Sequence, residues 1–159
     1  MDTSSLRDYA TVVAAIVALM VFILNSFSLV RNRRIENLAR FIETHDRLFS
    51  PDSYLATNII ALEKGELVRD FADAEMERRF LLMLLEIEQM ALLANNQAVP
   101  RHTQVYMFGS YARRLQKLFT VKERESMFWE LAIGYLDELA KDTDRYEKLT
   151  RKDRERFWH

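Results

Sequence analysis

Hydrophobic residues are unevenly distributed along the chain, and the longest apolar run comes first. From Tyr9 to Val30 the sequence has 22 consecutive residues without a charge, and residues 12–24 are all apolar. A helix rises about 1.5 Å per residue, so this run is long enough to cross a hydrocarbon core of about 30 Å. The pattern predicts a transmembrane helix over residues 9–30, preceded by a short extracytoplasmic tail, residues 1–8.

Two other structures satisfy the same pattern: the buried core helix of a soluble protein and a cleaved signal peptide. A core helix of this length normally keeps polar residues on one face, which the central part of this run lacks. Ser26 and Ser28 are small enough to flank a signal cleavage site. The residues before the run are not basic, however, because Asp2 and Asp8 offset Arg7. The sequence therefore favours a membrane anchor.

The charges on either side of the run predict its orientation. Residues 31–49 contain five arginines and three acids, whereas one arginine precedes the run. Basic residues close to a membrane span stay on the cytoplasmic side, so the N-terminus is predicted outside and the C-terminal domain in the cytoplasm. Three arginines directly after the span are expected to contact the membrane surface: Arg31, Arg33 and Arg34.

One face of the predicted span has residues typical of helix association. At 100° per residue, a stripe about 60° wide contains Ala14, Ala18, Val21 and Asn25. Small residues four apart let two helices approach closely, and an asparagine in hydrocarbon is better satisfied by a partner helix than by lipid. The stripe predicts a homo-oligomer seam. The alternative is that alanine is simply common in spans and that Asn25 is hydrated at the headgroups.

The rest of the chain has the composition and periodicity of an all-α domain. Three glycines and two prolines in 159 residues leave few helix breakers. The membrane helix is predicted to continue as a basic juxtamembrane stalk over residues 31–49, since no glycine or proline precedes position 51. Apolar residues at helical spacing then predict helices over residues 51–64, 73–95, about 101–119 and 124–140.

Counted together with the stalk, these helices are predicted to form a compact cytoplasmic bundle of about five helices, with the cytoplasmic helical domain over residues 50–140. The first of them is expected to begin with Ser50 as N-cap and Pro51 at the first helical position. The helix over residues 73–95 is apolar on most sides, which predicts that it lies at the centre of the bundle.

The last segment, residues 141–159, is rich in charged residues and is predicted to be a solvated helix or tail. It ends with the aromatic residues Phe157 and Trp158 beside several bases. The alternative interpretation is a tail whose aromatic and basic residues touch the membrane surface.

The sequence carries no motif typical of an enzyme. The phosphate-binding and nucleophile patterns GxxxxGKS/T, GxGxxG and GxSxG do not occur. The histidines, His45, His102 and His159, do not stand in HExxH or Glu-x-x-His spacing. The chain lacks cysteine, which removes thiolate chemistry, and its net charge of −1 is unlike that of a nucleic-acid-binding protein. No catalytic residue, cofactor or metal site is predicted.

One charged residue, Glu88, is predicted to be at least partly buried. Its neighbours three and four positions away are all apolar, so its carboxylate needs a partner or a raised pKa. Arg114 lies at the edge of an apolar face on a later helix and is the predicted partner. A buried ion pair of Glu88 and Arg114 is the favoured interpretation, and a functional role for Glu88 is the alternative.

The order of these segments resembles a known family. The residues that carry the likeness are the central helix LLxLLEIEQMALL (81–93), the helix MFGSYARRLQKL (107–118) and the segment FWELAIGYLDELAK (128–141). Together with the N-terminal span and the arginine-rich stalk, they resemble the bacterial proteins of domain-of-unknown-function family 4760. The resemblance implies a bacterial inner-membrane protein with a helical cytosolic domain, and it implies no activity or catalytic residues.

Two functions are compatible with this layout. The leading prediction is a non-enzymatic, membrane-tethered interaction module that forms a homo-oligomer and whose helical domain binds itself or a cytosolic protein partner. The alternative is an effector that oligomerises and perturbs the membrane within a bacterial defence or toxin module. An enzyme that uses Glu88 is a more distant third.

Overall fold

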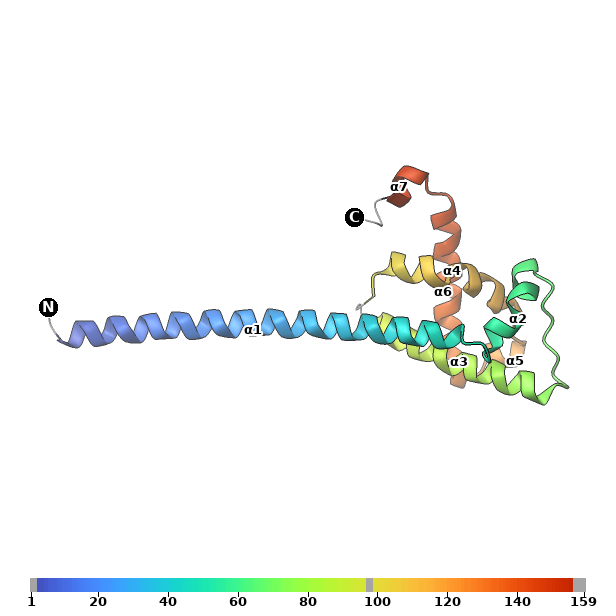
Figure 1. Ribbon diagram of the computed structural model, residues 1–159, viewed down its shortest axis with the longest axis horizontal. Helices are drawn as coiled ribbons and strands as arrows, with labels where there is room; N and C mark the ends of the chain where they lie inside the picture. The colour runs from blue at the N-terminus through green and yellow to red at the C-terminus, as the bar shows by residue number, and fades with distance from the viewer. Residues whose placement is uncertain (1–2, 97–98, 156–159) are drawn as a thin grey trace. The chain divides into compact units, whose positions relative to one another are not determined.

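The chain is all-α in the computed structural model, which describes residues 3–96 and 99–155. Neither range contains a strand. The chain divides into two compact units, Met1–Glu36 and Asn37–His159. The first unit is part of one long apolar helix, and the second is a helical bundle (Figure 1). The predicted fold class is therefore confirmed.

The first helix, α1, spans Thr3–Leu48 without interruption. Its continuity confirms that the apolar run and the stalk belong to one helix, as the missing glycine and proline predicted. Because α1 begins at Thr3, most of the predicted tail is helical, and residues 1–2 lie outside the described part. By length and composition α1 qualifies as a candidate membrane span, and the most apolar stretch of it is not buried inside the protein.

The second helix, α2, spans Tyr54–Lys64 and begins three residues later than the sequence suggested. Its N-cap is Ser53, which has an extended backbone and whose Oγ accepts a hydrogen bond from the N–H of Ala56 at 3.1 Å. The predicted cap, Ser50, instead donates its hydroxyl to the carbonyl of Arg47 at 2.9 Å. A serine side chain can bond the unpaired backbone groups at either end of a helix. Here Ser50 bonds a carbonyl at the end of α1, and Ser53 bonds an N–H at the start of α2.

The third helix, α3, spans Ala74–Asn95, with Asp73 as N-cap accepting from two backbone N–H groups. Its bounds agree closely with the predicted 73–95. Its predicted central position is wrong, because one side packs into the core while several of its leucines are exposed: Leu81, Leu82, Leu85 and Leu92. Leucine-rich composition on most sides therefore does not imply burial on all of them.

The C-terminal half of the bundle is divided into more elements than the sequence predicted. The segment expected to be one helix over 124–140 divides at Ser126, whose Oγ accepts from the backbone N–H of Phe128. A capping box of Thr120 and Glu123 begins the short helix before it. The elements are α4 Arg101–Leu115, η1 Gln116–Leu118, α5 Val121–Arg124, η2 Met127–Trp129, α6 Glu130–Glu147 and α7 Arg151–Glu155. The last helix of the predicted bundle thus ends at Glu147 rather than near 140.

Helix α6 crosses both α3 and α4, and its contacts with these two helices hold the bundle together (Figure 1). The end of α1 contributes Phe41 and Leu48 to the same core. The core is a single hydrophobic cluster whose largest fully buried side chains are Phe41, Phe80, Phe108, Leu48, Leu55, Leu84, Ile87, Met90, Leu115, Leu136 and Leu139.

Candidate functional site

The four predicted seam residues lie on the N-terminal part of α1, and each is exposed: Ala14, Ala18, Val21 and Asn25. Next to them, Ser26 donates its hydroxyl to the carbonyl of Phe22 at 2.8 Å, so its polar group is satisfied within the helix. No such bond satisfies the Asn25 amide within the described residues. The side chain of Asn25 is thus available to another helix or to a lipid headgroup.

The three predicted surface arginines, Arg31, Arg33 and Arg34, are also exposed and belong to the same unit as the seam. No ion pair joins any of them to another described residue, in contrast with Arg47 later in α1. Arg47 pairs with Glu43 and, across to α3, with Glu86, at 3.0 Å each. Within α1, the arginines close to the apolar run thus have no ion pair with another described residue, whereas Arg47 joins the helix to α3.

The predicted pair of Glu88 and Arg114 is wrong. Arg114, at the end of α4, forms a bidentate ion pair with Glu63 of α2, with Nη2 and Oε2 2.8 Å apart. Glu88 is half-buried, as expected, but it has no ion pair among the described residues. The prediction placed Arg114 correctly at the edge of an apolar face, but it could not show which neighbouring helix supplies the acid.

A charge cluster that sequence reasoning missed is centred on Arg69, in the connection between α2 and α3. The Arg69 side chain is only 5 % exposed and pairs with Glu77 of α3 at 2.5 Å and Glu123 of α5 at 2.8 Å. Its guanidinium also lies 3.7 Å from the ring centroid of Phe80 and 4.7 Å from that of Phe71. These contacts hold a connection without regular structure against the bundle. Because Arg69 lies outside every helical pattern, periodicity could not identify it.

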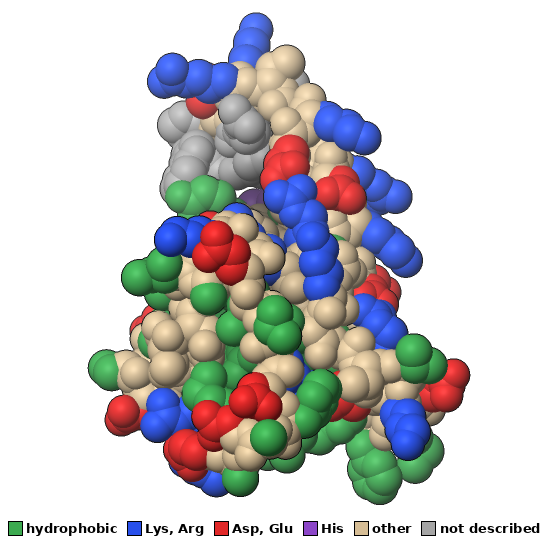
Figure 2. Space-filling model, turned by 90° about the vertical axis from the view of Figure 1, so that its right-hand side faces the viewer, with side chains coloured by type: hydrophobic (Ala, Val, Ile, Leu, Met, Phe, Trp, Pro, Cys, Tyr) green, Lys and Arg blue, Asp and Glu red, His purple; other side chains and the backbone are tan. Residues whose placement is uncertain are grey.

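The connection held by Arg69 exposes hydrophobic residues. Val68 and Phe71, on either side of Arg69, are exposed, as are Ile60 of α2 and Val121 of α5. Hydrophobic side chains gather in the lower half of the view in Figure 2, mixed with acidic and basic ones. These exposed apolar side chains therefore lie among charged ones, and the described residues do not show what covers them.

The crossing of α4 and α6 is close because Gly109 has no side chain. A Cβ added at Gly109 would lie 2.1 Å from Oγ1 of Thr143, whose hydroxyl donates to the carbonyl of Leu139. Ion pairs join the same two helices on both sides of this contact. Arg101 pairs with Asp142 at 2.7 Å, and Arg113 forms a bidentate pair with Glu147. The crossing is thus fixed by steric fit and by charge.

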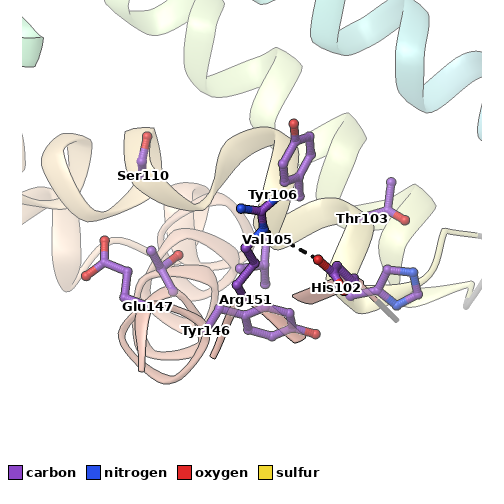
Figure 3. Close-up of a pocket in the computed structure, with 10 residues that line it drawn as sticks. His102, Thr103, Val105, Tyr106, Ser110, Tyr146, Glu147 and Arg151 are labelled. Atoms are coloured by element: carbon purple, nitrogen blue, oxygen red, sulfur yellow. Dashed lines mark ion pairs between the residues drawn. The ribbon is translucent and has the colours of Figure 1, made fainter. Parts of the chain in front are cut away.

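A pocket of about 540 Å³ lies beside this crossing, between α4, α6 and α7 (Figure 3). Its lining combines aromatic, hydroxyl and charged side chains: His102, Thr103, Val105, Tyr106, Ser110, Thr143, Tyr146, Glu147, Arg151 and Glu155. Two of its charged residues, Arg151 and Glu155, pair with each other at 3.4 Å, and Glu147 is held by Arg113. The predicted contact of Phe157 and Trp158 with the membrane, like His159, lies outside the described residues.

Comparisons with known protein families, with curated proteins and with solved structures found no match to this chain. The resemblance to domain-of-unknown-function family 4760 therefore stays a prediction. Within residues 3–96 and 99–155, no three His, Asp or Glu side chains are grouped so that they could hold a metal ion.

Proposed function

We propose that the protein is a non-enzymatic, membrane-tethered interaction module of a bacterial inner membrane. In this proposal α1 anchors the chain in the lipid, copies associate along α1, and the helical bundle binds itself or a cytosolic protein. The observation that carries the proposal is the exposure of the apolar run. Large hydrophobic residues from Val12 to Val30 are exposed on all sides of α1 and none of them is buried, whereas the bundle has a buried hydrophobic core.

The cost of that exposure in water supports a membrane environment. Each exposed apolar Å² costs about 25 cal/mol relative to burial, so a helix with apolar residues on every face is stable only in lipid or against other apolar helices. The hydrogen bond of Ser26 to Phe22 fits the same environment, because lipid offers no partner to a hydroxyl.

The orientation is testable with a reporter that is active only in the periplasm. Fused after His159, it is expected to be silent, because the arginines after the apolar run favour the cytoplasmic side. Activity of that fusion would contradict both the orientation and the cytoplasmic location of the bundle.

Self-association through the seam is testable by crosslinking the full chain in membranes. Ala14→Leu with Ala18→Leu blocks close approach of two helices, and Asn25→Leu removes the polar contact, so both variants are expected to crosslink less. Ala15→Leu is the matched control, because it adds the same side chain on another face of α1. Unchanged crosslinking in the seam variants would exclude this seam.

Expression in a bacterium separates an interaction module from a membrane-perturbing effector. The proposed module is expected to accumulate without effect on growth or on the membrane potential. Loss of the potential that depends on Ala14, Ala18 and Asn25 would instead support the effector, because one span per chain can perturb a membrane only by oligomerising.

A further inference from the structure

A groove runs between the C-terminal half of α3 and the start of α6. It encloses about 500 Å³, and its lining includes Ala91, Met127, Glu130, Gly134 and Glu138. Its floor is open at Gly134, where an added Cβ would meet nothing within 4 Å. Met127 at its edge is 79 % exposed, and Phe128 beside it is also exposed. The groove therefore presents apolar side chains and free space together.

The outer face of α3 also exposes apolar side chains. Leu81, Leu85 and Leu92 are 39–56 % exposed, and the helical repeat places them in one stripe. Glu88 lies inside the stripe, between Leu85 and Leu92 and one turn before Ala91, which lines the groove. A half-buried carboxylate among leucines, with no ion pair in the described part of the chain, lacks the cation that such a position favours.

The rim of the groove is acidic. Glu130 and Glu138 are exposed, and none of the residues that line the groove is a lysine or arginine. The nearby Arg101 lies 3.5 Å from Glu138 but makes its closer ion pair, at 2.7 Å, with Asp142. Among the described residues, Glu88 and Glu130 therefore have no cationic partner.

We propose that this groove binds an amphipathic helix of a partner protein, with apolar residues on one face and lysine or arginine beside them. A helix can pack along the leucine stripe of α3, and where α6 crosses α3 its side chains fill the space over Gly134 and Ala91. The bases of the partner helix pair with Glu88 and Glu130, which sets its direction and excludes acidic helices. This inference rests on the proposed function, since it gives the binding surface of the proposed module.

The test uses the full chain in a mild nonionic detergent, which keeps it in solution whether or not α1 spans a membrane. The probes are two fluorescent helical peptides with the same leucines, one with lysines and one with glutamates beside them, and detergent micelles alone are the blank. Fluorescence anisotropy is expected to show binding of the lysine peptide only. Gly134→Trp fills the groove and should weaken this binding by about tenfold or more, whereas Lys64→Trp on α2 should not.

A charge exchange keeps the test valid even if Gly134→Trp fails to fold. Glu88→Lys with Glu130→Lys is expected to lose the lysine peptide and gain the glutamate peptide. The matched control, Glu66→Lys with Glu125→Lys, makes the same change of charge at exposed positions outside the groove and should keep the original preference. Equal binding by both double variants would overturn the proposal.

If the parent binds neither peptide and the groove variants reduce self-association instead, the occupant is a second copy and the proposed partner is wrong. Membrane extraction, which does not depend on the groove, tests the anchor separately.

Discussion

Two phenylalanines of α1 have opposite environments, although both belong to one continuous helix. Phe27 is 71 % exposed, and Phe41 is fully buried in the bundle core. Around Phe27 apolar residues surround the helix, so no side of it can face water without cost. Around Phe41 the helix is amphipathic, with Arg40 and Glu43 exposed on the other side. Hydrophobic periodicity, more than hydrophobic content, therefore separates a helix that packs on protein from one suited to lipid.

The largest expected effect comes from truncating these two side chains in turn. Phe41→Ala removes a fully buried ring and leaves a cavity, which should lower the free energy of unfolding by about 3–5 kcal/mol. Phe27→Ala should leave the unfolding of the bundle unchanged, since this ring has no part in its core. Urea unfolding of the full chain in detergent measures both. Equal losses would mean that the apolar run packs on the bundle.

Arg69 is expected to have the next largest effect. Arg69→Met leaves Glu77 and Glu123 half-buried without their cation, which should cost about 3 kcal/mol, the lower end of the range for a stranded buried charge. Arg124→Met, which removes a more exposed arginine, is the control and should cost under about 1 kcal/mol. Thermal unfolding at neutral pH compares the two variants. A loss no larger than that of the control would show that Arg69 is not a structural clamp.

The Arg69 cluster also predicts a dependence on pH. Burial raises the pKa of Glu123, but hydrogen bonds from the Thr120 backbone N–H and from Arg69 outweigh this, and the net pKa lies below its ordinary value of 4.5. The contribution of Glu123 to stability is therefore complete above that value and is lost as the pH falls through its lower folded-state pKa. Stability of the parent should fall more steeply over this acidic range than that of Arg69→Met. Parallel curves of stability against pH for the parent and Arg69→Met would contradict this role of the Arg69–Glu123 pair.

The two helical glycines of the bundle should respond in opposite directions to the same change. Gly109→Ala places a methyl group against Thr143 and should cost about 1–3 kcal/mol through displacement of α4 from α6. Gly134→Ala adds a methyl group in open space and should stabilise α6 by up to about 1 kcal/mol. The melting temperature of each variant, compared with that of the parent, shows whether the change stabilises or destabilises the bundle. A destabilised Gly134→Ala would mean that the groove is closed in solution.

The smallest effect concerns the start of α2. Ser53→Ala removes the N-cap hydrogen bond and should cost about 1 kcal/mol, whereas Ser50→Ala should cost less, because Ser50 only donates to the end of α1. Chemical unfolding resolves the difference. The reverse order would support the helix start at Pro51 that the sequence suggested.

The overall fold could be predicted from sequence because its signals are local. The apolar run, the rarity of glycine and proline and the Gly65 stop, which has a φ of 72°, each act within a few residues. The division at Ser126 was missed, because residues 124–140 keep an apolar spacing that one uninterrupted helix also satisfies. The ion pairs were also not predictable. Arg114 pairs with Glu63, 51 residues away, and Arg69 pairs with Glu123, 54 residues away. The sequence does not specify which helices become neighbours, so it does not specify these pairs.

Extraction of membranes from expressing cells with alkaline carbonate tests whether α1 is a membrane anchor. The chain is expected to stay in the pellet at its full mass of 18.9 kDa. Val17→Arg with Met20→Arg should move it to the supernatant, since each charge at the centre of a span costs about 2.5–3.5 kcal/mol, whereas Ile35→Arg, beyond the apolar run, should not. Recovery of the unmodified chain in the supernatant, or of a shortened chain cleaved near Ser28, would contradict the claim.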